Sequence, residues 1–208
     1  ENFLNKNGIE IREYNEVRDY VEKIKDGSRV FIDPSRVNRW LYNGIPKGCK
    51  IVEETNITTN LKAIKNSVEI ENLKRCYIKD GVALVKFLYW IDKNLGKTPM
   101  SEISVSDKLE EFRREQEDFV EPSFGTIAAY KDHAPMMHYS ATEESDYTLK
   151  NEGMLLVDSG GQYLDGTTDI TRTIALGELT DDEKYHYTMV LKSHIALASA
   201  YFKEGDLK

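Results

Sequence analysis

The run MLLVDSGGQYLDGTTDITRTIAL, from Met154 to Leu176, organises the chain. It begins with a short apolar segment that ends at Asp158, passes through glycines and aspartates, and enters a second β-prone segment after Asp169. Apolar and β-branched segments separated by turn-forming residues predict two antiparallel strands. The two carboxylates, eleven residues apart, therefore flank a tight connection, and we interpret them as part of a metal site.

The register of this hairpin limits how the two aspartates can cooperate. A two-residue turn at Asp165-Gly166 would pair Asp169 with Gln162 and leave Asp158 roughly 13 Å further along the same face. Paired metals lie only about 3.5–4 Å apart, so that offset is too long for a shared centre. A wider turn, or a bulge at Gly160-Gly161, would bring the carboxylates together. We predict that the two carboxylates converge.

Composition narrows the possible classes of protein. With 208 residues, 40% of them hydrophobic, the chain can form one large or two small domains. A net charge of −8 without any Lys/Arg cluster argues against nucleic-acid binding. The longest apolar run, residues 82–91, is too short to cross a bilayer.

Cys49 and Cys76 suit free thiols in a reducing compartment. Because no secretion leader is visible, we expect a cytoplasmic protein, and the first residue, Glu1, suggests an interior fragment.

Two regions differ in pattern. Residues 1–65 alternate short strands and helices, which predicts an α/β layer, and they are too few for a large core of their own. Residues 66–208 predict a helix over 66–95 that begins at an Asn66/Glu69 capping box, a second over 101–117, a strand over 123–128, the hairpin, and a third helix capped by Thr180. That order indicates an α+β domain.

Each long helix carries an expectation about burial. The first should bury one stripe at spacings of three and four, formed by Ile70, Leu73, Tyr77, Gly81, Leu84, Leu88 and Ile91. Gly81 weakens a helix by about 1 kcal/mol, so we expect another backbone to pack against it. The charged run over residues 110–118 should face solvent. The third helix should bury a face that contains Val190, Leu191 and His194.

The aspartates have a functional and a structural interpretation. Asp158 follows three apolar residues, so its carboxylate lies at the mouth of a buried strand and needs a cation or several donors. Hard carboxylate oxygens without a nearby cysteine suit Mn²⁺ or Mg²⁺ better than structural zinc. The alternative is that both aspartates are ordinary turn residues.

Among the histidines, His138 is the best candidate for a functional role. It ends a strand-like run between Met137 and Tyr139, from which its imidazole could donate a hydrogen bond into a cleft; the alternative is a core histidine. His133 and His186 are expected to be exposed and without a role. No nucleophile-elbow, P-loop or dinucleotide motif is present in the sequence.

The segment DSGGQYLDGTTDITRT, residues 158–173, resembles the first metal-binding segment of Xaa-Pro aminopeptidases (aminopeptidase P), which are pita-bread metallopeptidases. The agreement extends to residues 63–84, 110–130 and 136–141, and it is closest to the long, cytosolic type. Residues 31–42 resemble the end of that family's preceding domain. The resemblance implies the C-terminal part of an α/β creatinase N-terminal-like domain over residues 1–65. Over residues 66–208 it implies the first half of a pita-bread (creatinase/aminopeptidase-like) domain.

The resemblance also implies a reaction. Such enzymes release an N-terminal residue when proline follows, through a hydroxide that bridges two divalent metals, usually Mn²⁺. Asp158 would hold one metal, Asp169 would bridge both, and His138 would bind the substrate. The remaining ligands, one histidine and two glutamates, belong to the second half of the domain. We therefore expect the 208-residue chain alone to bind metal weakly and to lack peptidase activity.

Two alternatives follow from the same residues. Prolidase shares the fold and both aspartates, and assays on a dipeptide and a longer peptide would separate it from an aminopeptidase. A metal-free pita-bread protein that binds a peptide or protein is the second, although two close carboxylates repel each other without a metal. The expected partner is a peptide substrate with proline in second position, without nucleic acid or membrane. A homodimer is left open, and the loop over residues 131–135 departs from the family pattern.

Overall fold

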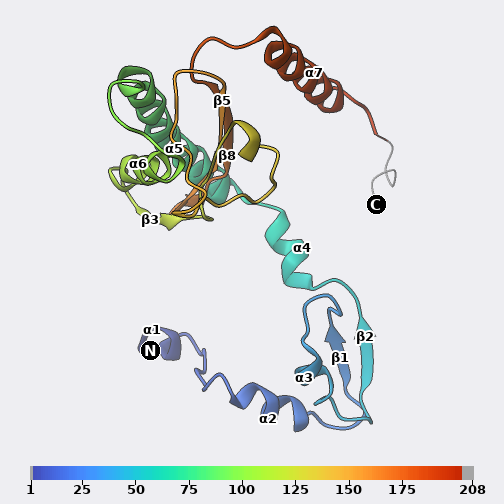
Figure 1. The fold of residues 1–208 in the computed structure, drawn as a ribbon. Helices are drawn as coiled ribbons and strands as arrows, with labels where there is room; N and C mark the ends of the chain where they lie inside the picture. Colours follow the sequence, from blue (N-terminus) through green and yellow to red (C-terminus); the bar gives the residue numbers. More distant parts are fainter. Residues whose placement is uncertain (1, 203–208) are drawn as a thin grey trace. The chain divides into compact units, whose positions relative to one another are not determined.

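The computed structural model describes residues 2–202 of the chain. The chain forms two compact units, whose boundary lies between Lys65 and Asn66 (Figure 1). The first unit contains a two-stranded sheet, and the second contains two three-stranded sheets. Within residues 2–202, no helix is both long enough and apolar enough to cross a membrane.

The N-terminal unit contains a two-stranded parallel sheet. Strands β1 (Arg29–Ile32) and β2 (Lys50–Glu53) pair in parallel, with Val30 opposite Ile51. The helices of this unit are α1 (Asn2–Lys6), α2 (Glu16–Glu22), α3 (Arg39–Tyr42) and α4 (Ile57–Ala63). Parallel strands joined through a helix confirm the α/β expectation. Ile32 is the one buried hydrophobic side chain among the described residues of this unit, so its core is small.

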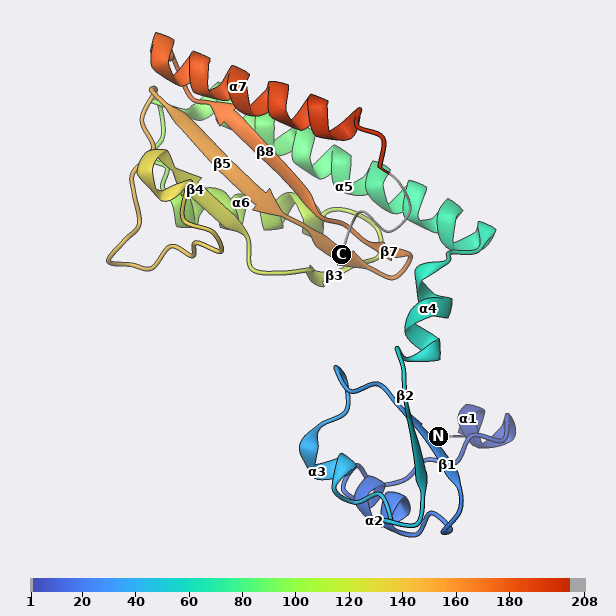
Figure 2. The same cartoon turned by 90° about the vertical axis from the view of Figure 1, so that its right-hand side faces the viewer.

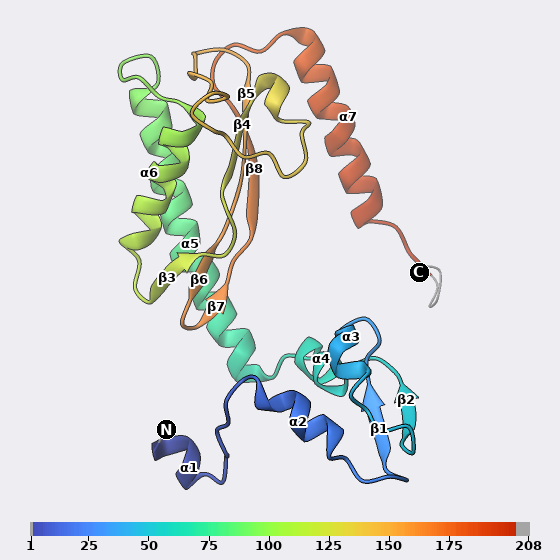
Figure 3. The ribbon, with the colours of Figure 1, turned by 60° about the horizontal axis from the view of Figure 1, so that its bottom comes forward.

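The helices of the second unit begin where the sequence predicted. Helix α5 (Ser67–Asn94) starts at the Asn66/Glu69 capping box, in which each side chain accepts the other's backbone N–H. Helix α6 (Glu102–Arg114) starts at Ser101, and it ends three residues earlier than predicted. Both helices cover one face of the sheet that contains β5 (Met154–Ser159). Helix α7 (Asp181–Ala198) lies on the other side of that sheet (Figures 2 and 3). The core of this unit therefore lies between the sheet and α5 and α6.

The buried stripe of α5 differs from the predicted one. Its buried members are Cys76, Asp80, Ala83, Leu84, Phe87 and Ile91. Tyr77 is 44% exposed, and a Cβ on Gly81 would meet no heavy atom within 4 Å. The expected backbone contact at Gly81 is therefore wrong. The buried face of α5 is thus rotated around the helix axis relative to the predicted face. The apolar pattern misses this face because a charged residue, Asp80, occupies one of its buried positions.

The second unit holds two small antiparallel sheets. In one, β5 (Met154–Ser159) lies between β4 (Ile127–Tyr130) and β8 (Ile170–Ala175); in the other, β6 (Gly161–Tyr163) lies between β3 (Phe119–Pro122) and β7 (Gly166–Thr167). Of the strand predicted over residues 123–128, only residues 127–128 lie in a strand, β4, and residues 123–126 connect β3 to β4. Burial alternates along β5, where Leu155, Val157 and Ser159 are buried. The opposite, half-exposed face contains Asp158.

Helix α7 confirms one prediction and contradicts another. Its Thr180/Glu183 capping box is present. The expected buried face is not, since no residue of α7 is buried, Val190 is 70% exposed and His194 is exposed. Val190, Leu191 and His194 of the predicted face instead line an open groove.

Candidate metal-binding site

The hairpin has one register throughout both sheets. Tyr163 pairs with Gly166, so the turn is Leu164-Asp165, one residue earlier than the turn at Asp165-Gly166 considered above. Toward the base of the hairpin, Asp158 pairs with Thr171. Neither a wider turn nor a bulge is present, because equal numbers of residues separate the two pairs on each strand.

This register places Asp158 and Asp169 on the same face. Thr171 lies directly opposite Asp158, and Asp169 precedes Thr171 by two residues, so both point the same way from the sheet. Such diagonal neighbours are about 7–8 Å apart, and their side chains are somewhat closer. The one-residue change in the turn halves the offset that a turn at Asp165-Gly166 would give. The register is therefore compatible with the predicted convergence of the two carboxylates.

Between the two sheets, the strands of the hairpin come very close together at Gly160. Ser123 bridges them, because its N–H donates to Gly160 O at 3.1 Å and its hydroxyl donates to Thr168 O at 2.9 Å. Gly161 and Thr168 also exchange hydrogen bonds of 2.9 Å. A Cβ on Gly160 would lie 2.0 Å from Thr168 O, so only glycine fits. We call this crossing of Ser123, Gly160, Gly161 and Thr168 the seam.

The surroundings of the two aspartates suit a hard cation in kind. Asp158 is half-buried, and the Thr171 hydroxyl donates to its Oδ1 at 2.8 Å, while Asp169 is exposed. Carboxylate oxygens without cysteine are the ligands that Mn²⁺ and Mg²⁺ prefer. Across residues 2–202, however, no group of three or more His, Cys, Asp or Glu side chains is placed to hold a metal. The donors therefore fit such an ion in type but are too few for a complete site.

A groove opens on the face of the sheet that carries Asp158. It has a volume of about 490 Å³ and lies between β8 and α7. Its lining residues are Met154, Thr171, Arg172, Thr173, His186, Tyr187, Val190, Leu191 and His194. Thr171 thus both lines the groove and contacts Asp158. The carboxylate face is open rather than packed against the core.

His138 lies in a turn and not at the end of a strand, so that local prediction is wrong. The turn follows the 3₁₀ helix η1 (Lys131–His133) in the connection from β4 to β5. Its φ of 58° is in the left-handed region, which few residues other than glycine adopt, and its side chain is exposed. No hydrogen bond joins His138 to Asp158 or Asp169 within the described part of the chain. The register orients the two aspartates toward one face, and His138 lies in a separate loop.

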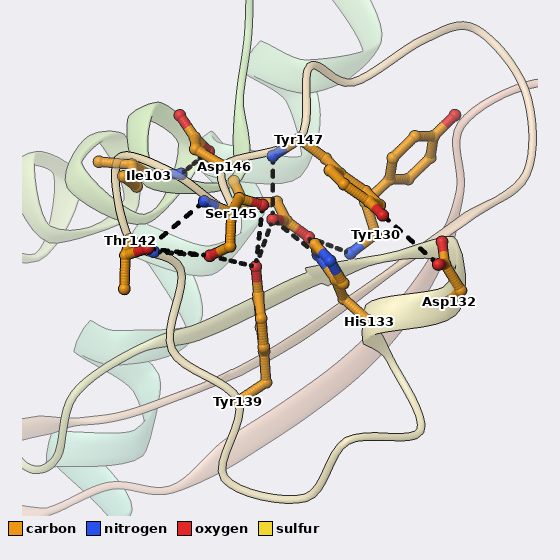
Figure 4. Close-up of polar contacts among 10 residues, drawn as sticks. Ile103, Tyr130, Asp132, His133, Tyr139, Thr142, Ser145, Asp146 and Tyr147 are labelled. Atoms are coloured by element: carbon orange, nitrogen blue, oxygen red, sulfur yellow. Dashed lines mark hydrogen bonds and ion pairs between the residues drawn. The ribbon is translucent and has the colours of Figure 1, made fainter.

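A buried carboxylate that the sequence did not reveal lies at the base of this loop. Glu102 is fully buried, and its oxygens accept hydrogen bonds from four groups (Figure 4). One of these is His133, whose Nδ1 lies 2.9 Å from Oε1; His133 was expected to be exposed but is only 7% exposed. Burial and the hydrogen bond to Glu102 raise the pKa of Tyr139, whose hydroxyl therefore stays protonated as a donor. No local signal marks Glu102, since acidic residues are common in the first turn of a helix.

A second buried network supports the strand that ends in Asp158. Arg113 donates from Nε to Asp80 Oδ1 at 2.7 Å and from Nη2 to Ser159 Oγ at 3.1 Å. The Tyr163 hydroxyl donates to the same Asp80 oxygen at 2.9 Å, and burial raises the pKa of Tyr163 far above its ordinary value. Arg113 lies in the charged run that was expected to face solvent, yet its side chain is 1% exposed. The network fixes Ser159, the residue next to Asp158.

Comparison with known proteins identifies the class. Residues 71–206 match the model of metallopeptidase family M24, and residues 1–69 match that of the creatinase/prolidase N-terminal domain. Because the first match covers more than half of the chain, the chain belongs to metallopeptidase family M24. This confirms the predicted α+β fold, a pita-bread domain preceded by an α/β creatinase N-terminal-like domain.

Individual relatives agree with the predicted resemblance to Xaa-Pro aminopeptidases. The protein named Xaa-Pro aminopeptidase 1 of Dictyostelium discoideum is 42% identical over 200 residues, which is 94% of this chain and 31% of that protein. The crystal structure of X-prolyl aminopeptidase from Caenorhabditis elegans, described as a cytosolic enzyme with a di-nuclear active site, has a TM-score of 0.87 and 32% identity. That match covers 96% of this chain and 34% of that one.

A prolidase has the same fold. The enzyme from Pyrococcus furiosus gives a TM-score of 0.68 at 19% identity, over 89% of this chain and 52% of that one. At that identity the likeness concerns the fold alone. The chain spans about a third of the length of the curated relatives it matches.

Proposed function

We propose that the chain is part of an Xaa-Pro aminopeptidase, which releases the N-terminal residue from peptides with proline in second position. The observation that supports this proposal is the hairpin register, in which Asp158 of β5 and Asp169, the residue before β8, are oriented toward the same open face. The similarity to proteins named Xaa-Pro aminopeptidase supports the same assignment.

Each candidate residue then has a role. Asp158 and Asp169 would hold divalent metal, Asp158 as a ligand of one ion and Asp169 as a ligand shared by two, and Mn²⁺ is the proposed ion. Thr171 orients Asp158 through the hydrogen bond to Oδ1. Residues 1–65 form the C-terminal part of the creatinase N-terminal-like domain, and residues 66–208 form the first half of the pita-bread domain. The division at Lys65 and Asn66 between the two compact units supports these limits.

The chemistry divides between metals and side chains. Divalent cations at such a site supply Lewis-acid activation of water and of the scissile carbonyl. Asp158 and Asp169 fix where that activation occurs, and His138 donates a hydrogen bond to the bound peptide from its exposed turn. The nitrogen of a Xaa-Pro bond carries no hydrogen, so it must receive a proton as the bond breaks. None of the three residues is assigned that proton.

The proposal predicts a sharp contrast between the isolated chain and the whole enzyme. The described residues supply two carboxylates where a dinuclear site needs more ligands, so the 208-residue chain alone should bind Mn²⁺ weakly and cleave nothing. The full-length protein with Mn²⁺ should cleave a tripeptide with proline in second position. Cleavage of that tripeptide by the purified 208-residue chain would contradict the assigned ligand set.

Variants of the full-length protein test the site itself. Asp158→Asn and Asp169→Asn should each abolish cleavage and reduce bound Mn²⁺, measured by metal analysis after dialysis. Asp181→Asn, at a fully exposed position of α7, is the control and should leave both unchanged. Activity that survives both substitutions would refute the metal assignment.

The choice of substrates separates the alternatives. A prolidase would cleave the dipeptide Xaa-Pro and spare the tripeptide, whereas an aminopeptidase should cleave the tripeptide. A metal-free binding protein would bind the peptide without cleaving it. We place the enzyme in the cytoplasm, which the free thiols of Cys49 and Cys76 and the cytosolic Caenorhabditis elegans enzyme support. Size-exclusion chromatography distinguishes a monomer from a homodimer.

A further inference from the structure

The turn that carries His138 is held at both ends by one buried carboxylate. His133 precedes the turn and Tyr139 closes it, and both side chains bond to Glu102. We propose that Glu102, acting through Tyr139, is the positioning element that sets where the His138 imidazole meets the substrate. This inference rests on the proposed function, in which His138 binds the peptide.

Glu102 is built as a hub. It is the first residue of α6 and is fully buried. Oε1 accepts from Tyr130 N–H at 2.7 Å and lies 2.9 Å from His133 Nδ1; Oε2 accepts from the Tyr139 hydroxyl at 2.8 Å and from Tyr147 N–H at 3.1 Å. These groups come from the end of β4, from η1, from the turn and from the segment that leads back toward β5 (Figure 4). One side chain therefore ties together four parts of the β4–β5 connection.

The first end of the turn is held by packing as well as by the hydrogen bond. The His133 ring stacks on Tyr147, with centroids 3.7 Å apart, and lies 4.5 Å from the centroid of the Tyr139 ring. The three rings and Glu102 form one cluster, in which His133 lies next to both tyrosines. His133 therefore has little room to move independently of the rest.

Tyr139, at the second end of the turn, links His138 to Glu102. Tyr139 directly follows His138, and its hydroxyl is nearer to Glu102 Oε2 than to either oxygen of Ser145, which lie at 3.4 Å. Backbone bonds close the turn, from Met136 N–H to His133 O and from Tyr139 N–H to Met136 O, each 3.1 Å. His138 thus sits between fixed neighbours with a φ of 58°, while its ring is exposed.

The loop is also attached to the first turn of α6. Asp146 Oδ1 accepts from Ile103 N–H at 3.0 Å, and Glu102 N–H donates to Tyr147 O at 3.1 Å. Leu149 N–H donates to Met100 O at 2.8 Å. Helix α6 packs in the core through Val105 and Leu109, so Glu102, its first residue, is part of a rigid element. None of the hydrogen bonds described for Glu102 involves Asp158 or Asp169, so a displaced Glu102 should act first on the loop that carries His138.

The test uses two tyrosines that contact the same histidine. Tyr139→Phe removes the hydroxyl that donates to Glu102 and keeps the aromatic ring beside His133. Tyr147→Phe is the matched control, because its ring also packs on His133 but its hydroxyl contacts Asp132, at 3.4 Å. In the full-length enzyme, Tyr139→Phe should lower kcat/KM for a Xaa-Pro tripeptide by about tenfold to a hundredfold. Bound Mn²⁺ should not change, and Tyr147→Phe should resemble the wild type.

A double-variant comparison separates positioning from stability. In the His138→Ala background, Tyr139→Phe should have no further effect on kcat/KM, because the residue through which it acts is gone. An undiminished effect in that background would overturn the proposal. Should Tyr139→Phe fail to fold, Glu102→Gln replaces it, since an amide has one acceptor oxygen for four donors and should give a loss at least as large.

A spectroscopic readout keeps this inference distinct from the proposed function. In ¹³C-histidine-labelled protein, the His138 ring resonance is assigned by its loss in His138→Ala. It should shift or broaden in Tyr139→Phe and stay in place in Tyr147→Phe. An unmoved His138 resonance in Tyr139→Phe would overturn the positioning role even in an active enzyme. A wild-type protein that binds no Mn²⁺ and cleaves no peptide would instead refute the proposed function, while the resonance still reports on the hub.

Discussion

Asp158 and Thr171 face each other across β5 and β8, and the Thr171 hydroxyl donates to Asp158 Oδ1 at 2.8 Å. Thr171→Val keeps the β-branched shape and removes only this donor. Loss of such a partner of a metal ligand typically weakens metal binding about 10- to 100-fold, and we expect that loss for Mn²⁺ in the full-length enzyme, measured by titration calorimetry. Thr173→Val, on the same face of the same strand, is the control. Equal affinities for the two variants would argue against Asp158 as a ligand.

Two glycines should respond to alanine with opposite signs. At Gly160 a Cβ would lie 2.0 Å from Thr168 O and 2.3 Å from Ser123 Oγ, so Gly160→Ala should destabilise the protein by about 1–3 kcal/mol or more. At Gly81, inside α5, a Cβ meets no heavy atom within 4 Å, so Gly81→Ala should stabilise by about 0.5–1 kcal/mol. Urea unfolding midpoints measure both. A tolerated Gly160→Ala would show that the seam can open.

The buried arginine should matter far more than its exposed neighbour. Arg113→Met leaves the Asp80 carboxylate buried without its cation, which should cost about 3–5 kcal/mol in the free energy of unfolding. Arg114→Met removes a surface pair with Glu110 and should cost about 0–1 kcal/mol. Denaturant unfolding of the two variants gives the comparison. Similar losses for both would mean that the network with Ser159 and Tyr163 holds without Arg113.

The two cysteines should differ in reactivity. Burial, with a smaller contribution from the Asp165 charge, raises the pKa of Cys76 to about 11. The thiolate is the reactive form and predominates only above the pKa, so at pH 8 only about one Cys76 in a thousand is ionised. Iodoacetamide at pH 8 should therefore label the partly exposed Cys49 and spare Cys76 until the protein unfolds. Mass spectrometry of digested protein, with Cys49→Ser as the reference, measures the result; rapid labelling of Cys76 in folded protein would contradict its burial.

Local signals predicted the helix starts because the groups involved are close in sequence. The capping boxes at Asn66 and Thr180 each join residues three apart, and the structure contains both. The expected wider turn or bulge is wrong, because the hairpin keeps a two-residue turn one position before the Asp165-Gly166 pair, although Asp-Gly is a strong turn signal by itself. In the structure, Asp165 instead bonds to Lys79 at 2.9 Å, and Gly166 packs against Cys76. These contacts with α5, distant in sequence, hold the turn at this position.

The buried polar clusters were beyond sequence analysis for the same reason. Glu102 and His133 are 31 residues apart, and Asp80 and Arg113 are 33 apart. A charged side chain looks solvent-exposed until its partner is known, and a single sequence does not supply that partner. Asp80 left the best clue, because it lies four residues after Cys76 on a stripe that continues through Leu84. A period traced through Cys76 and Phe87, rather than Tyr77, would have indicated a buried charge.

The seam has a consequence for how the hairpin can vary. Ser123 bonds to both strands at Gly160 and Thr168, between the turn and the carboxylates. The pairing of Asp158 with Thr171 is therefore held at the seam, and residues added or lost at Leu164-Asp165 should change the short β6–β7 tip and its contacts with α5. Engineered variants should therefore tolerate a change in length at this turn, such as an inserted peptide tag, with Asp158 still opposite Thr171. The half of the hairpin that carries Asp158 and Asp169 should therefore keep its strand pairing when the turn changes.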